Sequence, residues 1–156
     1  MKLTNLLRKD LVVFDLEEDE RNSVLKEMIG IIKQKNRFIK EKDLFEKLLQ
    51  REDLGSTAIG SGVAIPHCKL KSVKEPIVML AVSRRGVDFR SLDGNASHIF
   101  FLVVSSPDSP SLNLQILAAI AHLVRRAESL LDRILAAESA EAILEIIREE
   151  ENSLNE

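Results

Sequence analysis

The residues best suited to chemistry lie in one segment that runs from an arginine to a histidine. Between Arg51 and His67 the chain reads R-E-D-L-G-S-T-A-I-G-S-G-V-A-I-P-H. An imidazole with a free ring nitrogen is a nucleophile or a base, arginine is a permanent cation, and a glycine-rich stretch exposes backbone amides that bind anions. From residue type alone, His67 is nonetheless more simply explained as a histidine in a turn. The pattern of the whole segment therefore carries the functional prediction.

The remaining histidines and the single cysteine offer no second reactive centre. Cys68 does not readily share a metal ion with its neighbour His67, and no spaced Cys/His set accompanies the pair. We expect Cys68 to be a small, partly buried residue. His98 begins a predicted strand without an adjacent carboxylate, and His122 is expected as a core or boundary residue of a helix. The sequence thus predicts no metal site, no cofactor and no internal disulfide.

The composition is that of an ordinary globular protein. The 156 residues are 45% hydrophobic and 30% charged, with a mean hydropathy of -0.02. A net charge of -3 and the absence of Trp and Tyr argue against nucleic acid as a partner. The longest apolar runs, such as Ile77–Val82, are far shorter than the roughly 20 residues that span a bilayer, and the first ten residues contain no apolar segment of secretory length. We therefore expect no membrane insertion and a cytoplasmic location.

Short apolar runs and helical periodicities alternate around the reactive segment. Runs with β-branched and aromatic residues predict strands at Val12–Leu16, Ile77–Ser83 and Ser97–Ser105. Apolar spacings of three and four predict helices from Asp19 to about Lys35, over Glu41–Gln50, from the Ser109-Pro110 pair to about Arg126, and after a Ser139 cap. Gly55–Gly62 should be an irregular loop or ribbon, Arg84–Asn95 a polar connection, and Glu149–Glu151 a fraying helix end.

This alternation predicts the fold class. Strands and helices interleave without an internal repeat or a low-complexity linker, so we expect a single α/β domain over residues 1–156, with its core at about 4–150. A central mixed β-sheet should be flanked by helices, because the two longest strand runs are apolar on both faces.

The reactive segment has a specific likeness. It resembles the active-site segment of the enzyme IIA domains of the fructose, mannitol and nitrogen-regulatory type in the bacterial phosphoenolpyruvate-dependent phosphotransferase system. The likeness joins R-E at a helix end to L-G-S-T-x-I-G-x-G-x-A-I-P-H at fixed spacing, and it continues at Val87–Phe89, Leu92–Gly94 and Ile99–Val104. It spans nearly the whole chain and implies the enzyme IIA fold.

The resemblance implies roles for individual residues. His67 would accept a phosphoryl group, and Pro66 would restrict the positions of His67 by fixing the approach of the chain. Arg51 would supply the positive charge that stabilises the transferred group, although it also suits a simple cap of the preceding helix. The hydroxyls of Ser56 and Thr57 would donate to the phosphoryl oxygens or, equally well, form ordinary turn hydrogen bonds.

One position departs from the family pattern. A second histidine usually opens the helix after the last buried strand, in an H-L dipeptide, whereas this chain has Asn113-Leu114. The Asn113 amide donates hydrogen bonds but carries no charge, so it would support His67 or a phosphoryl oxygen without titrating.

The resemblance implies a phosphohistidine carrier that receives its phosphoryl group from HPr or from a nitrogen-branch HPr-like protein. Without a fused IIB-like, IIC-like or HPr-like segment, the chain is more similar to a freestanding nitrogen-regulatory IIA. Two alternatives stay open. One is a sugar-specific IIA that passes the phosphoryl group to a IIB partner in fructose/mannitol-type uptake, and the other is a non-enzymatic binding module that acts on a regulated target protein. The sequence identifies neither the sugar, nor the target, nor the oligomeric state.

Overall fold

A computed structural model describes residues 1–154, and the last two residues of the predicted domain lie outside the described residues. The helices are α1 (Arg21–Lys35), α2 (Glu41–Asp53), α3 (Pro110–Arg126), α4 (Leu130–Ala136) and α5 (Ala140–Leu154), preceded by a 3-10 turn, η1 (Leu3–Asn5). The strands are β1 (Leu7–Val13), β2 (Ala58–Gly60), β3 (Val63–Ala64), β4 (His67–Lys69), β5 (Ile77–Val87) and β6 (Ser97–Ser105).

These strands form one mixed sheet, as the sequence predicted. In the described part of the chain the order is β1-β5-β6-β3-β2, and β4 also pairs with β6. The two long central strands, β5 and β6, are antiparallel, and so are β2 and β3. In contrast, β1 pairs with β5 in parallel, and β3 and β4 both pair with β6 in parallel. Because β3 and β4 both run along β6, the chain that joins them is held against the centre of the sheet.

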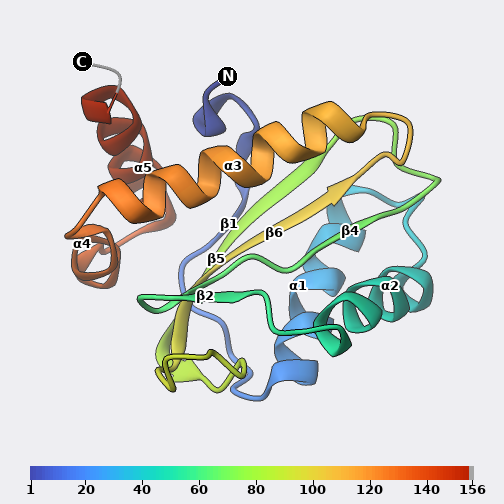
Figure 1. The fold of residues 1–156 in the computed structure, drawn as a ribbon, viewed down its shortest axis with the longest axis horizontal. Helices are drawn as coiled ribbons and strands as arrows, with labels where there is room; N and C mark the ends of the chain where they lie inside the picture. Colours follow the sequence, from blue (N-terminus) through green and yellow to red (C-terminus); the bar gives the residue numbers. More distant parts are fainter. Residues whose placement is uncertain (155–156) are drawn as a thin grey trace.

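Helices cover both faces of the sheet (Figure 1). Successive residues of a strand point to opposite faces, and Phe100 and Phe101 of β6 accordingly belong to different core clusters. One cluster contains Met28 of α1 and Leu48 of α2, and the other contains residues of α3, α4 and α5 such as Ile120. Burial on both faces explains why the central strands are nearly continuous apolar runs, and it confirms the predicted α/β class.

The first strand differs from its sequence prediction. Strand β1 covers Leu7–Val13 instead of Val12–Leu16, and its middle residues Arg8–Asp10 are exposed. These polar residues lie at an edge of the sheet, where they need no apolar alternation, so a hydrophobicity pattern does not detect them. Leu16 is buried outside β1, where its amide donates to the Val82 carbonyl over 2.7 Å.

The C-terminal region corrects two further expectations. Short helix α4 is not predicted by the sequence, and Glu149–Glu151 do not form a fraying end. Arg133 of α4 pairs with Glu149 and Glu150, and the buried Glu151 carboxylate accepts the amides of Leu3 and Thr4 over 2.7 and 2.9 Å. Acidic residues that are unfavourable at a helix end are therefore stabilised by partners that are remote in sequence.

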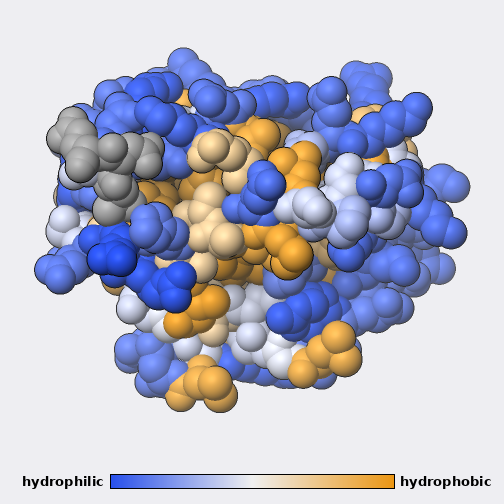
Figure 2. All heavy atoms as spheres, turned by 45° about the horizontal axis from the view of Figure 1, so that its top comes forward, coloured by the Kyte–Doolittle hydropathy of each residue, from blue (hydrophilic) through white to orange (hydrophobic). Residues whose placement is uncertain are grey.

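The surface is mostly polar, and apolar side chains gather in the middle of the face that Figure 2 shows. Across residues 1–154, none of the helices combines the length and the apolar character that crossing a bilayer requires. The large apolar residues that remain exposed are Met1, Phe38, Leu54, Ile59, Leu92 and Leu114. Two of them, Leu54 and Leu114, flank the site described next.

Candidate active site

A surface cavity of about 860 Å³ lies where the end of α2, strand β4 and the beginning of α3 meet. Three of the predicted site residues line it, namely Arg51, His67 and Asn113. They come from three elements, so the sheet and its flanking helices bring them together. The other lining residues are Lys47, Gln50, Asp53, Leu54, Cys68, Lys69, Val103, Ser105, Pro110, Leu114 and Leu117.

The backbone holds the His67 ring in one position and favours one of its neutral tautomers. It opens β4, is half-buried, and lies opposite Val103 of β6, whose amide donates to the Pro66 carbonyl over 2.9 Å. The His67 Nδ1 atom lies 2.7 Å from the Ile65 carbonyl oxygen. Because a carbonyl oxygen only accepts hydrogen bonds, we assign the ring proton to Nδ1. In the neutral ring this leaves the lone pair of Nε2 free to accept a group.

The surroundings of His67 favour this neutral form. Burial lowers the pKa of His67 below its ordinary value, because a charged imidazole is poorly solvated there. The hydrogen bond to Ile65 opposes this effect and is the next largest influence on the pKa. Of the two neighbouring charges, Arg51 lowers the pKa and Glu52 raises it. A pKa below the ordinary 6.5 means that the neutral ring, with Nε2 unprotonated, predominates at neutral pH.

Arg51 serves as a helix cap and also lines the cavity. It lies in the last turn of α2, and its Nη1 atom donates to the Gly55 carbonyl over 2.8 Å. Both interpretations from the sequence are thus compatible with its position. Within residues 1–154, no carboxylate lies within ion-pair distance of this guanidinium. Its charge is therefore not neutralised by a direct partner and is available to an anion in the cavity.

Asn113 presents a carbonyl oxygen that no described residue satisfies. The side chain is 6% exposed and lies in the first turns of α3, where its Nδ2 atom donates to the Ser106 carbonyl over 3.1 Å. Its Oδ1 atom is buried and has no hydrogen-bond partner within residues 1–154. A buried acceptor without a partner is unfavourable, and this one belongs to a residue that lines the cavity.

Ser56 and Thr57 do not line the cavity. The Ser56 hydroxyl donates to the Phe89 carbonyl and accepts the Ala58 amide, so it forms turn hydrogen bonds. Thr57 is buried, and both its amide and its hydroxyl donate to the carboxylate of Glu52. Direct contact of either hydroxyl with a phosphoryl oxygen stays a prediction.

Glu52 is a residue that the sequence analysis missed. It is only 3% exposed and follows Leu44 and Leu48 at intervals of four residues on the buried face of α2. The sequence did contain a signal for this residue, namely a carboxylate at the next position of the apolar stripe of a helix. Because acidic residues are almost never fully buried without partners, such a position indicates a buried carboxylate with specific hydrogen-bond donors. The partners come from Thr57, five residues further along the chain.

The neighbouring thiol of Cys68 is not an alternative nucleophile. Burial raises the pKa of the Cys68 thiol to about 12, so the reactive thiolate is disfavoured at neutral pH. Cys68 is partly buried, as predicted. Within residues 1–154, no group of three or more His, Cys, Asp or Glu side chains is arranged to hold a metal ion.

His122 is exposed, contrary to the expectation of a core or boundary position, because its side of α3 faces away from the sheet.

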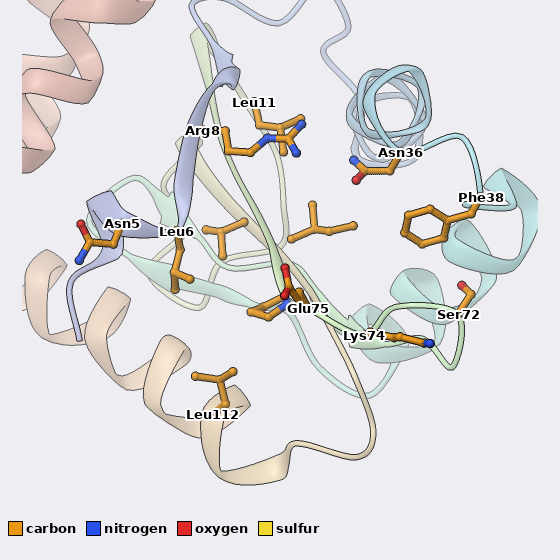
Figure 3. A pocket seen from close by; sticks show the side chains of 13 residues that line it. Asn5, Leu6, Arg8, Leu11, Asn36, Phe38, Ser72, Lys74, Glu75 and Leu112 are labelled. Atoms are coloured by element: carbon orange, nitrogen blue, oxygen red, sulfur yellow. The ribbon is translucent and has the colours of Figure 1, made fainter.

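Cavity size alone does not single out this site. A second cavity of about 860 Å³ lies beside β1, between η1, the loop after α1 and the loop before β5. Figure 3 shows Arg8, Asn36, Phe38, Glu75 and other side chains around it. It contains no histidine or cysteine. The chemistry of the lining residues therefore identifies the cavity at His67 as the candidate active site.

Fold and site together define a class of protein: an α/β domain that presents a neutral histidine, with a free Nε2 atom, beside an unneutralised arginine. Comparisons with known proteins identify the family. Residues 5–150 match the family described as "Phosphoenolpyruvate-dependent sugar phosphotransferase system, EIIA 2". The chain belongs to this EIIA family and is a phosphoryl-transfer component of that system.

Relatives from both branches of the family are similar to the chain. It is 34% identical over 149 residues to the PTS system fructose-specific EIIABC component of Bacillus subtilis. This match covers 96% of the present chain but only 23% of the Bacillus subtilis protein. It is 32% identical over 147 residues to the nitrogen regulatory protein of Bradyrhizobium diazoefficiens, with 94% and 95% of the two chains covered. The crystal structure of the nitrogen regulatory protein IIA-Ntr from Neisseria meningitidis superimposes with a TM-score of 0.85 at 26% identity, covering 93% and 98% of the two chains.

Proposed function

We propose that the protein is a phosphohistidine carrier whose acceptor atom is His67 Nε2. The donor is the phosphohistidine of HPr or of a nitrogen-branch HPr-like protein. A nitrogen–phosphorus bond forms at His67 Nε2 while the corresponding bond of the donor breaks, and its electron pair returns to the donor imidazole. The observation that carries this proposal is the 2.7 Å contact of His67 Nδ1 with the Ile65 carbonyl, which leaves Nε2 free in a cavity that Arg51 also lines.

The chain's own residues contribute mainly position and charge. Phosphoryl transfer proceeds through a loose transition state with negative charge on the equatorial oxygens, so fixed cations and donors matter more than covalent chemistry. Arg51 lies where it would stabilise this charge. The carbonyl oxygen of Asn113 cannot donate, but its second amide hydrogen would be available to a phosphoryl oxygen. No proton has to leave His67, because the neutral ring attacks through Nε2.

The rim of the cavity suits a protein donor. Leu54 and Leu114 are 85% and 69% exposed and both line this cavity, so its rim offers two apolar side chains that a docked surface would bury. Lys47 and Lys69 add positive charge beside them. A donor protein would bury the two leucines while its phosphohistidine enters between them.

The regulatory branch is favoured over sugar uptake. The supporting observation is structural similarity: the nitrogen regulatory protein IIA-Ntr from Neisseria meningitidis superimposes on this chain with a TM-score of 0.85 at 26% identity. A sugar-specific IIA that passes the phosphoryl group to a IIB partner stays the alternative, because the fructose-specific relative has the highest identity of those described above. A binding module that acts on a regulated target without transfer is the alternative of another class. A cytoplasmic location stays a prediction in each case.

A phosphorylation assay tests the carrier proposal. The protein is incubated with phosphoenolpyruvate, enzyme I and HPr or its nitrogen-branch counterpart, and the modified residue is mapped by mass spectrometry. We expect one acid-labile, base-stable phosphoryl group on His67, lost in His67→Ala and kept in the matched variant His122→Ala, which removes an exposed histidine. A label that persists in His67→Ala would refute the assignment of the acceptor, and a wild-type protein that accepts no phosphoryl group would favour the binding module. Onward transfer to an added IIB domain would favour the sugar-specific alternative.

A further inference from the structure

A continuous path of hydrogen bonds connects the end of α2 to the ring of His67. The two carboxylate oxygens of Glu52 accept the Thr57 amide over 3.0 Å and the Thr57 hydroxyl over 2.5 Å. The Thr57 carbonyl in turn accepts the Ile65 amide over 3.0 Å. The Ile65 carbonyl accepts the proton of His67 Nδ1 over 2.7 Å. Each step of this path is either a direct hydrogen bond or the covalent main chain of one residue, Thr57 or Ile65.

The path matters because it ends on the atom that selects the tautomer. A neutral imidazole carries its proton on the nitrogen that finds an acceptor, and the other nitrogen then keeps its lone pair. The acceptor here is a carbonyl whose own residue, Ile65, is fixed through Thr57. Movement of Thr57 would displace the Ile65 carbonyl and weaken the preference of His67 for the Nδ1–H form.

We propose that Glu52 is a positioning residue, which anchors Thr57 and thereby holds the Ile65 carbonyl that keeps His67 Nε2 free. The inference rests on the proposed function in one respect, namely that Nε2 is the acceptor atom. Glu52 does not line the cavity and is not expected to touch the donor or the phosphoryl group. Its effect is transmitted through the chain between α2 and β4.

The cost of burying this carboxylate supports a specific role. Within residues 1–154, Glu52 forms no ion pair, and its oxygens are satisfied by one amide and one hydroxyl. An unpaired buried charge is unfavourable, and an apolar residue would suit the Leu44 and Leu48 stripe better. The charge also acts on His67 directly, because Glu52 raises the pKa of that imidazole whereas Arg51 lowers it. The other charged groups that line the cavity are Lys47, Asp53 and Lys69.

The test compares Glu52→Leu with Glu52→Gln in the full-length protein. Glutamine keeps an oxygen for the Thr57 amide and adds an NH2 group that can donate to the Thr57 hydroxyl, whereas leucine removes both contacts with Thr57. The tautomer of His67 is read from the nitrogen chemical shifts of its ring by NMR, without any donor present. We expect Glu52→Leu to give a mixture of tautomers and Glu52→Gln to keep the wild-type Nδ1–H form.

Transfer kinetics supply the second readout, measured well below the unfolding temperature of each variant. We expect Glu52→Leu to lower kcat by roughly tenfold, as for a misplaced reacting group, with KM for the phosphorylated donor unchanged. Glu52→Gln should recover most of the rate. If Glu52→Leu lowers the melting temperature but keeps both the wild-type tautomer and kcat, Glu52 is only structural and the proposal is wrong.

A second variant makes the outcome independent of whether Glu52→Leu folds. Thr57→Val removes the hydroxyl that donates to Glu52 with little change of shape, and Thr57→Ser restores it. The same two readouts should move in Thr57→Val and return in Thr57→Ser, and an unchanged tautomer in Thr57→Val would also overturn the proposal. The NMR readout needs no phosphoryl transfer, so failure of the carrier function would be distinguished from failure of the positioning role.

Discussion

The two cavities of equal volume differ in what their arginines can do. In the cavity of Figure 3, the Arg8 guanidinium donates to both carboxylate oxygens of Asp10 over 3.0 Å, so its charge is largely satisfied. In the cavity at His67, the Arg51 guanidinium donates to a neutral carbonyl and keeps its charge. Of the two arginines, only Arg51 therefore keeps a charge that an anion in its cavity would meet.

The two cavities also differ in how their asparagines are used. Both amides donate to a main-chain carbonyl, that of Asn36 to Ile32 and that of Asn113 to Ser106, each over 3.1 Å. Asn36 ends helix α1, whereas Asn113 faces a cavity that already holds a histidine. Similar local hydrogen bonds thus occur at a helix end in one cavity and beside a histidine in the other.

The largest predicted difference concerns the two arginines. Arg51→Ala should lower the rate of phosphoryl transfer on the order of a hundredfold, because a charge-assisted contact in the transition state is lost. Its effect on stability should stay under about 1 kcal/mol, as expected for a partly exposed cation at a helix end. Arg8→Ala is the matched control and should leave transfer unchanged. Rates are measured with phosphorylated donor in excess, and melting is followed by circular dichroism.

The contrast between the arginines would fail in either of two ways. Near-normal transfer by Arg51→Ala would reduce this residue to a helix cap. A rate defect in Arg8→Ala would mean that the cavity of Figure 3 also takes part in transfer.

A smaller difference is predicted for the exposed apolar residues of the two cavities. Leu114→Glu should raise KM for the phosphorylated donor by about tenfold, since loss of about 1.4 kcal/mol of contact energy weakens binding by that factor. Phe38 lines the other cavity and is 55% exposed, compared with 69% for Leu114. Phe38→Glu should leave KM unchanged. Equal effects of the two variants would place the donor surface elsewhere. Steady-state kinetics with increasing donor concentration measure both values.

A change of a few-fold is predicted where this chain departs from its family pattern. With Asn113, phosphoryl acceptance should follow the ionisation of His67 alone. Asn113→His should add a second ionisation near pH 6.5, by coupling two imidazoles in one cavity. Asn36→His is the control and should leave the rate profile unaltered. The acceptance rate is measured against pH with fully phosphorylated donor, and identical profiles for wild type and Asn113→His would show that residue 113 is remote from the acceptor.

The smallest predicted effect is the pH dependence of stability. Burial lowers the pKa of His67 in the folded protein, so the unfolded chain binds more protons just below pH 6.5. The free energy of unfolding should therefore decrease as the pH falls through 6.5. The contribution of His67 to this decrease should end once the pH is below the pKa of His67 in the folded protein. His67→Gln should remove this part of the pH dependence. Chemical denaturation at several pH values measures it, and an opposite slope would mean that the charged imidazole is favoured in the folded protein.

The residues of the candidate site were more predictable from the sequence than some of the elements around them. The strand Ser97–Ser105 and the helix beginning at Pro110 were predicted at their observed boundaries, because strong apolar periodicity and a proline at the first helical position are local signals. The reactive segment Arg51–His67 was likewise readable from its residue pattern. In contrast, β1 and α4 gave weak local signals, since tertiary pairing rather than alternation stabilises them.

The sequence by itself determined the family likeness, the fold class and the identity of His67, Arg51 and Asn113 as candidates, because these depend on residue type and on spacing along the chain. Only the tertiary structure decided that Ser56 and Thr57 form hydrogen bonds with protein groups, and that Glu52 is buried. It also decided which nitrogen of His67 is free. Hydrogen-bond partners are chosen by proximity in space, and residues as far apart as Ser56 and Phe89 meet only after the sheet has formed.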